Sequence, residues 1–141
     1  MITSTIISTL DADISTVWRI VTDARRYAEW RGDLERVEVS DKLHFTEHTR
    51  DGFATHFTVT QSHAPELWEL HIENANLTGR WLGEFGSLGK KTGVRFTEYI
   101  RTKKPIPAFI VKCYLKNQQK AFIDDLKASF QSYELNAGRS D

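Results

Sequence analysis

Two carboxylates fall on strand faces that otherwise carry apolar side chains. Glu47 shares its strand face with Phe45, and Glu98 is expected to lie opposite Trp81 on the inward face of a hairpin. A carboxyl group buried among aromatic rings has a raised pKa and can donate or accept a proton near neutral pH. Each glutamate could instead lie near a strand end and reach water or an arginine. We favour that interpretation for Glu47 and leave both open for Glu98.

The histidines could suggest a metal site, but the expected strand registers argue against one. They place His56 opposite His71, with His44 and His48 diagonal to that pair, all on the outer face. His44 and His48 are four residues apart on a strand, about 13 Å, and cannot share an ion. No third ligand accompanies His56 and His71, so we expect no metal.

Other catalytic signatures are absent from the sequence. It contains no G-x-S-x-G elbow, phosphate-binding loop or dinucleotide fingerprint. Cys113 is the single cysteine, which excludes an intramolecular disulfide, and we expect it to be buried on a helix. We therefore expect no cofactor, and Glu98 is the one candidate catalytic residue.

The charge balance limits the classes of partner. The chain has 19 basic and 19 acidic residues, whereas nucleic-acid binders usually show a basic excess, so we expect no nucleic-acid partner. Short basic clusters at 90–91 and 101–104 are interpreted as solvated turn charges. The first residues lack the positive and apolar regions of a signal peptide, and no stretch is long enough to span a bilayer. We expect a cytoplasmic protein without membrane insertion.

The first part of the chain predicts one strand and two short helices. The strand covers 2–10 and is rich in Ile and Thr. Asp13 is a candidate N-cap for a helix with apolar residues at helical spacing: Ile14, Val17, Trp18 and Val21. Asp23 can cap a second helix that carries Tyr27 and Trp30 and ends at 32–33.

Six strands follow, and the length of each turn decides which side chains share a face. A three-residue turn at 50–52, with Gly52 in the left-handed conformation, places Phe45 opposite Phe57. A two-residue turn would place Phe45 opposite a threonine. The apolar pattern therefore selects the longer turn.

The same test sets the later hairpins. A loop at 62–65 is expected to pair Phe57 with Leu70, and a tight turn at 74–75 to pair Trp68 with Trp81. A turn at 89–90 then pairs Trp81 with Glu98. One apolar face results, and it must be buried against another element.

A long helix supplies the matching surface. From 108 to about 136 the sequence has no proline or glycine. Its stripe at helical spacing consists of Val111, Leu115, Gln118, Gln119, Phe122, Leu126, Phe130 and Tyr133.

The segment LDADISTVWRIVTDARRYAEW, which begins at Leu10, resembles the opening of the SRPBCC superfamily, with its START-like, pollen-allergen-like and polyketide cyclase/dehydrase-like members. GVRFTE, from Gly93, resembles its late strands. The resemblance implies an α+β helix-grip fold: two short helices after the first strand, and a curved seven-stranded antiparallel sheet around a long C-terminal helix. It implies one ligand-binding domain over 1–136. We expect the short tail at 137–141 to be frayed.

The resemblance also implies a cavity between sheet and helix. Combined with the face pattern, it gives these candidate ligand-binding residues: Phe57, Trp68, Leu70, Gly79, Trp81, Gly83, Phe96, Glu98, Leu115, Gln118 and Phe122. Gly79 and Gly83 flank Trp81, where they could leave room for a ligand or let the sheet bend.

Three functions are consistent with these features. The first is binding of a small hydrophobic or aromatic molecule, such as a lipid or a polyketide-like metabolite, in the cavity. The second is a cyclase, dehydratase or hydrolase that uses Glu98 as a general acid or base. The third is an interaction module with a filled core. The oligomeric state is left open.

Overall fold

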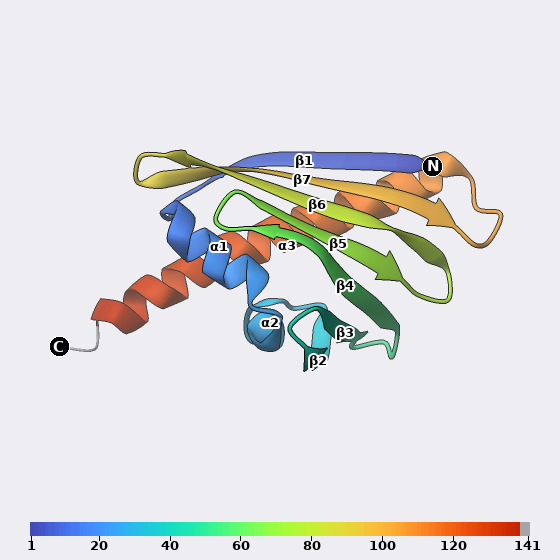
Figure 1. Cartoon of the computed structure of the whole chain (residues 1–141), viewed down its shortest axis with the longest axis horizontal. Helices are drawn as coiled ribbons and strands as arrows, with labels where there is room; N and C mark the ends of the chain where they lie inside the picture. The colour runs from blue at the N-terminus through green and yellow to red at the C-terminus, as the bar shows by residue number, and fades with distance from the viewer. Residues whose placement is uncertain (139–141) are drawn as a thin grey trace.

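The chain folds as a seven-stranded antiparallel sheet that curves around one long helix (Figure 1). The computed structural model describes residues 1–138, and their side chains as far as Gln131. The elements are β1 (Ile2–Leu10), α1 (Ile14–Thr22), the 3₁₀ turn η1 (Ala24–Arg26), α2 (Tyr27–Trp30), β2 (Leu34–Asp41), β3 (His44–Thr49), β4 (Ala54–His63), β5 (Leu67–Glu73), β6 (Leu77–Leu88), β7 (Lys91–Thr102) and α3 (Ala108–Gly138). The strand order is β1-β7-β6-β5-β4-β3-β2, which confirms the expected helix-grip architecture.

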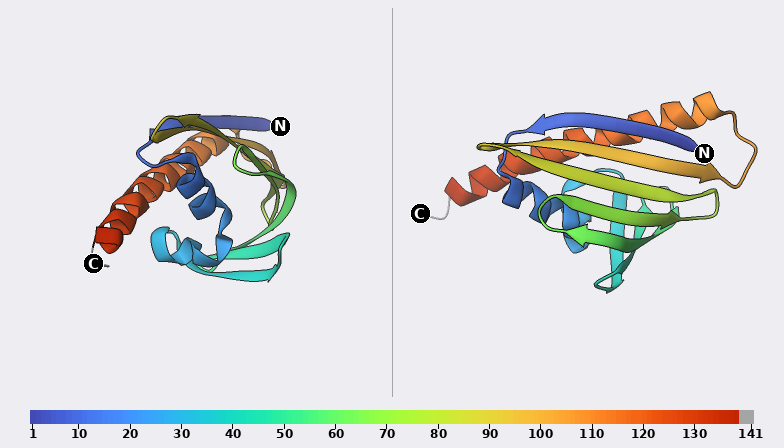
Figure 2. Two further views of the ribbon diagram at one scale, coloured as in Figure 1. Left: turned by 60° about the vertical axis from the view of Figure 1, so that its left-hand side comes forward. Right: turned by 45° about the horizontal axis from the view of Figure 1, so that its top comes forward.

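The sheet curls so that its concave face receives α3 (Figure 2). The buried stripe of the helix includes Val111, Leu115, Leu126 and Phe130. Gln119, in the middle of this stripe, bonds to the edge strand β1: its Nε2 donates to the Ser4 carbonyl at 2.9 Å and its Oε1 accepts from Ser4 Oγ at 2.9 Å. A polar residue in an apolar stripe therefore fixes the helix against the sheet.

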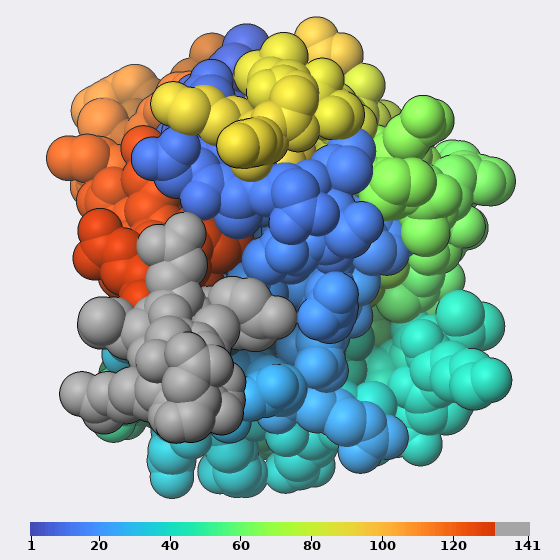
Figure 3. Space-filling view, turned by 90° about the vertical axis from the view of Figure 1, so that its left-hand side faces the viewer, coloured from blue at the N-terminus to red at the C-terminus, as the bar shows by residue number. Residues whose placement is uncertain are grey.

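The two short helices fill one end of the curl. In Figure 3, which faces that end, side chains of α1 lie between those of α3 and those of the strands. The Trp18 ring packs edge-on against Phe85 with centroids 5.2 Å apart, and Trp30 packs against Phe122 at 5.3 Å. Both tryptophans are therefore structural contacts between the short helices and the main layers.

Two of the predicted hairpins are confirmed. Gly52 has φ +85° and Phe45 lies opposite Phe57 in the β3–β4 hairpin. In the β6–β7 hairpin Trp81 lies opposite Glu98. Glycine is the residue that reaches such positive φ without strain, which is why these turns could be identified from the sequence.

The two middle registers were predicted wrongly. Phe57 lies opposite Ile72, where Leu70 was expected, and a bulge between Val59 and Gln61 shifts the rest of β4. Leu70 lies opposite Trp81, so the expected pairing of Trp68 with Trp81 is also wrong. Each expected pairing is displaced by two residues, so the inward face keeps its composition.

The β5–β6 turn is wider than expected because Asn74 organises it. The Asn74 Oδ1 atom accepts hydrogen bonds from the backbone N–H groups of Asn76, at 2.8 Å, and Leu77, at 2.9 Å. The backbone N–H of Asn74 also donates to the Leu77 carbonyl at 3.0 Å, so the side chain and the backbone of Asn74 together close the turn, as asparagine commonly does.

The outer face and the outside of α3 give two further corrections. His56 lies opposite Glu73 and His71 opposite Thr58, so the expected histidine pair does not form. Cys113 is exposed, because it lies on the side of the helix away from the buried stripe. In the described part of the chain no three His, Cys, Asp or Glu side chains are placed to hold a metal ion.

The ends of the chain add two observations. The expected tail at 137–141 lies largely outside the described residues, and α3 continues as far as Gly138. Within the described residues, no helix combines the length and the apolarity that crossing a bilayer requires.

Candidate functional site

A cavity of about 350 Å³ lies between the concave face of the sheet and α3. Its lining comes from strands β1 and β3 to β7, the two short helices with the segment before β2, and one side of α3. This volume falls in the range of small-molecule sites in proteins.

The inner walls of the cavity are aromatic and rigidly packed. The Trp81 ring lies 4.9 Å from Phe96 and 6.0 Å from Trp68, centroid to centroid. Phe122 of α3 packs edge-on against Phe96 at 5.7 Å. Since these rings hold one another in place, the wall has a fixed shape and does not collapse into the space.

The predicted ligand-binding residues mostly line this cavity. Nine of the eleven do: Phe57, Trp68, Leu70, Trp81, Phe96, Glu98, Leu115, Gln118 and Phe122. They come from strands β4 to β7 and from α3.

Gly79 and Gly83 are the exceptions, and the idea that they leave room for a ligand is corrected. A Cβ atom at Gly83 would lie 2.6 Å from the Trp81 ring, so this ring already fills the space. A Cβ atom at Gly79 would lie 2.2 Å from the Tyr99 carbonyl oxygen in the next strand. The two glycines therefore permit close packing within the protein.

An arginine cluster forms the polar part of the lining. Arg31 donates to both carboxylate oxygens of Glu47, at 2.7 and 3.2 Å, and to Asp33 at 3.0 Å. Its guanidinium also lies over the rings of Tyr27, at 5.2 Å, and Phe122, at 5.3 Å. The expectation that Glu47 reaches an arginine is confirmed.

The charges in this cluster stabilise one another. Burial alone lowers the pKa of the Arg31 guanidinium, but the facing carboxylates of Glu47 and Asp33 outweigh it and hold that pKa above its usual value. Arg31 therefore stays charged, and its charge is already compensated inside the protein.

Glu98 differs from Glu47 because it has no partner. Among the described residues no hydrogen bond or ion pair reaches its carboxyl group, which lines the cavity opposite Trp81. Burial, and secondarily the negative charge of Glu47, raise the pKa of Glu98 to about 7, against the opposing effect of Arg31. Near neutral pH this carboxyl is present in both forms and can donate or accept a hydrogen bond.

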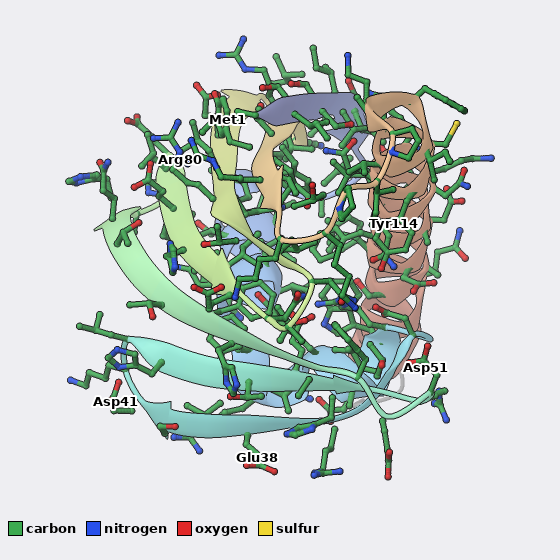
Figure 4. All side chains as sticks on the ribbon, turned by 90° about the vertical axis from the view of Figure 1, so that its right-hand side faces the viewer. Met1, Glu38, Asp41, Asp51, Arg80 and Tyr114 are labelled. Carbon is green, nitrogen blue, oxygen red and sulfur yellow. The ribbon has the colours of Figure 1, made fainter. Side chains whose placement is uncertain are left out.

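The mouth of the cavity lies between α3 and the β3–β4 and β5–β6 turns, at the other end of the sheet from α1. The α3 side is formed by exposed residues that include Tyr114, Gln118 and Ala121. Gln118 Nε2 donates to Tyr114 Oη at 3.0 Å. Figure 4 looks onto this end and labels Tyr114 on α3 and Asp51 in the β3–β4 turn.

Sequence reasoning missed Arg31, Asp33 and Tyr114 as lining residues. Arg31 and Asp33 lie in the short connection between α2 and β2, where no periodic pattern sets the direction of a side chain. Tyr114 lies one helical turn before Gln118, which the predicted stripe already included, so helical spacing could have placed it on the same face of α3.

A family model matches most of the sequence, including nearly all the elements that form the cavity. The family model described as polyketide cyclase / dehydrase and lipid transport matches residues 10–127, from the end of β1 into α3. The chain belongs to this family. No curated protein matches the sequence.

Several solved structures share the fold of this chain, which is of the SRPBCC or START-like type. A START superfamily protein from Mycobacterium smegmatis has a TM-score of 0.87 at 12% identity, covering 93% of this chain and 98% of that one. A conserved protein from Geobacillus kaustophilus has a TM-score of 0.82 at 11% identity, over 93% and 96%. CalU16 from Micromonospora echinospora has a TM-score of 0.70 at 12% identity, over 91% and 73%. Similarity at this level of identity establishes the fold.

Proposed function

We propose that the protein binds a small, mainly apolar molecule with an aromatic or polycyclic part in the cavity between the sheet and α3. The observation that carries the proposal is the cavity of about 350 Å³ with rigid aromatic walls. An open space of this size favours a ligand-binding protein over an interaction module with a filled core. The family description, which names polyketide cyclases and lipid transport, supports the same class of ligand.

The electrostatics of the lining favour a neutral ligand. Arg31 is the cationic side chain of the lining and is already bound by Glu47 and Asp33. Glu98 adds a further group that carries negative charge when ionised. A carboxylate-bearing ligand such as a free fatty acid would face these acidic groups, and the described residues of the lining offer it no free cation. A phenol or an alcohol can instead donate a hydrogen bond to Glu98.

The direct test is uptake of the neutral fluorophore N-phenyl-1-naphthylamine, whose emission rises in an apolar site. Ala121 lines the mouth on the exposed side of α3, so Ala121→Trp should obstruct entry with little effect on folding. Ala128 is exposed on the same helix and does not line the cavity, so Ala128→Trp is the matched control.

We expect saturable binding to the wild type and to Ala128→Trp, and binding at least about ten-fold weaker to Ala121→Trp, a loss of about 1.4 kcal/mol. No saturable uptake by the wild type, or equal uptake by both tryptophan variants, would contradict the proposal.

Acid–base catalysis in the same cavity is the second candidate function. The supporting observation is Glu98, an unpaired carboxyl in an apolar lining with a pKa raised to about 7, which suits a group that both gives and takes a proton near neutral pH. Glu98→Gln keeps the size of the side chain and removes its proton chemistry. A binding protein should keep its affinity for a neutral ligand in this variant, whereas an enzyme of cyclase or dehydratase type should lose turnover.

A further inference from the structure

The surface at the start of α3 differs in charge from the rest of the molecule. Residues 99–123 contain six basic side chains and no acidic one, although the whole chain has a net charge of zero. The six are Arg101, Lys103, Lys104, Lys112, Lys116 and Lys120. We call residues 101–120, from the end of β7 through the loop into α3, the α3 tip.

The α3 tip also exposes large apolar side chains. Phe109 is 72% exposed, Tyr114 55%, Ile110 48% and Ile106 40%. These four make up half of the exposed large hydrophobic residues of the described chain, gathered within nine positions. A concentration of this kind marks a surface that meets another apolar phase.

The folded protein does not use most of these charges for its own stability. Lys103 bonds Glu73 at 2.7 Å, and Lys116 donates to the Thr5 carbonyl, which leaves its charge uncompensated. The other four basic residues have no acidic partner among the described residues. Basic groups near a helix N-terminus also oppose the helix dipole, and the first turn of α3 has no acidic residue to offset them.

The position of the α3 tip makes it accessible. The loop and the first turns of α3 project at one end of the molecule, beyond the strands (Figures 1 and 2). The mouth of the cavity opens at this end as well, and Tyr114 belongs to both the mouth and the α3 tip.

We propose that the α3 tip docks on an anionic lipid membrane, with Phe109 and Ile110 inserted among the headgroups and the lysines above the lipid phosphates. Helices that bind to the surface of a membrane typically combine exposed apolar side chains with lysines and lack acidic residues beside them. A second copy of the chain is a poor occupant, because two such surfaces would bring together ten uncompensated basic side chains, five from each copy. A bilayer neutralises basic groups at any spacing, whereas an acidic protein must match their positions.

This docking does not depend on an occupied cavity, since it rests on the outer side chains alone. Where the cavity holds a lipid-soluble ligand, as proposed above, docking would turn its mouth toward the source of that ligand.

Vesicle sedimentation tests the proposal on the full-length protein. The vesicles are phosphatidylcholine alone or phosphatidylcholine mixed with phosphatidylglycerol, at an ionic strength of about 0.05 M and again at about 0.5 M. Phe109→Glu is compared with Leu88→Glu, which places the same change on an exposed residue of the β6–β7 turn at the opposite end of the molecule. Lys112→Gln is compared with Lys42→Gln in the β2–β3 turn.

We expect the wild type to bind the anionic vesicles at low salt, and to bind weakly to neutral vesicles or at high salt. Phe109→Glu should weaken binding at least about ten-fold and Lys112→Gln about five-fold, while both control variants bind as the wild type does. Absence of binding to anionic vesicles, or equal losses in Phe109→Glu and Leu88→Glu, would overturn the proposal. The proposal would also be overturned if the wild type formed a dimer, did not bind vesicles, and became monomeric in the Phe109→Glu variant. The α3 tip would then be an interface between two copies of the chain.

Discussion

At the scale of single residues, the contrast between Glu47 and Glu98 defines the chemistry of the cavity. Both carboxylates point inward, but Arg31 compensates only Glu47. The pKa of Glu98 rises to about 7 because burial disfavours its charged form and Glu47 adds to that effect. The protein therefore keeps one carboxyl that is free to interact with a ligand.

This raised pKa predicts a pH-dependent stability. An unfolded glutamate titrates near 4.5 and the folded Glu98 near 7, so between these values the native state holds a proton that the unfolded chain has lost. The free energy of unfolding must then fall as the pH rises from about 4.5 to about 7. Glu98→Gln removes this dependence and should stabilise the protein at about pH 8 by up to about 3 kcal/mol, with no gain at about pH 4.

Urea denaturation of both proteins across this pH range measures the difference. Because water reaches part of the Glu98 side chain, we expect the measured gain to fall below this upper figure. A variant equally or less stable than the wild type at about pH 8 would show that Glu98 is solvated or paired.

Glu98 could be predicted as a cavity residue from the sequence, whereas Arg31 could not. The difference is whether the residue lies in a regular strand or in an irregular connection. The β6–β7 register follows from a short turn at Gly89, which has φ +69°, and it fixes the direction of Glu98 through strand alternation. Arg31 follows α2 in an irregular connection, and its direction is set by its bonds to Glu47 and Asp33. These contacts are formed only in the folded protein, and no local sequence pattern predicts them.

At the scale of elements, glycines in β6 have different roles that their sequence positions do not reveal. A Cβ atom at Gly79 would meet backbone, at Gly83 it would meet the edge of the Trp81 ring, and at Gly86 it would meet nothing within 4 Å. Backbone cannot move aside as a ring can, so the cost of adding a methyl group should follow that order.

Alanine substitutions measure this order directly. Gly79→Ala should lose the most free energy of unfolding, at or above about 3 kcal/mol, and Gly83→Ala about 1–3 kcal/mol. Gly86→Ala should remain within about 0.5 kcal/mol of the wild type. If Gly83→Ala is neutral and also weakens ligand uptake, the space beside Trp81 belongs to the cavity after all.

The elements also show where reasoning from the sequence stops. The turns at Gly52 and Gly89, where glycine adopts a positive φ, can be predicted from the sequence because glycine marks them. The turn after β5 is held by the Asn74 side chain, and the bulge near Val59 has no glycine to mark it, so both registers were misplaced. Because each misplaced pairing kept the same inward side chains, the composition of the cavity wall was still predicted.

At the scale of the whole molecule, one end is closed and the other is open. The short helices pack Trp18 and Trp30 into the closed end, and the mouth and the α3 tip share the open end. The fold could be predicted because an extended apolar face and one long striped helix have few ways to bury each other. The empty volume of the cavity could not be predicted from the sequence, because it depends on how the rings of Trp68, Trp81 and Phe122 pack together.

The proposed function requires that the cavity between the sheet and α3 admits a ligand. Its most direct test is a crystal structure of the wild-type protein soaked with 6-bromo-2-naphthol, with the bromine located by its anomalous scattering. We expect a bromine position inside the cavity, among Trp81, Leu115 and Phe122, with the naphthol hydroxyl within hydrogen-bonding distance of Glu98. A structure in which side chains fill the cavity, or in which bromine lies only on the outer surface, would contradict it.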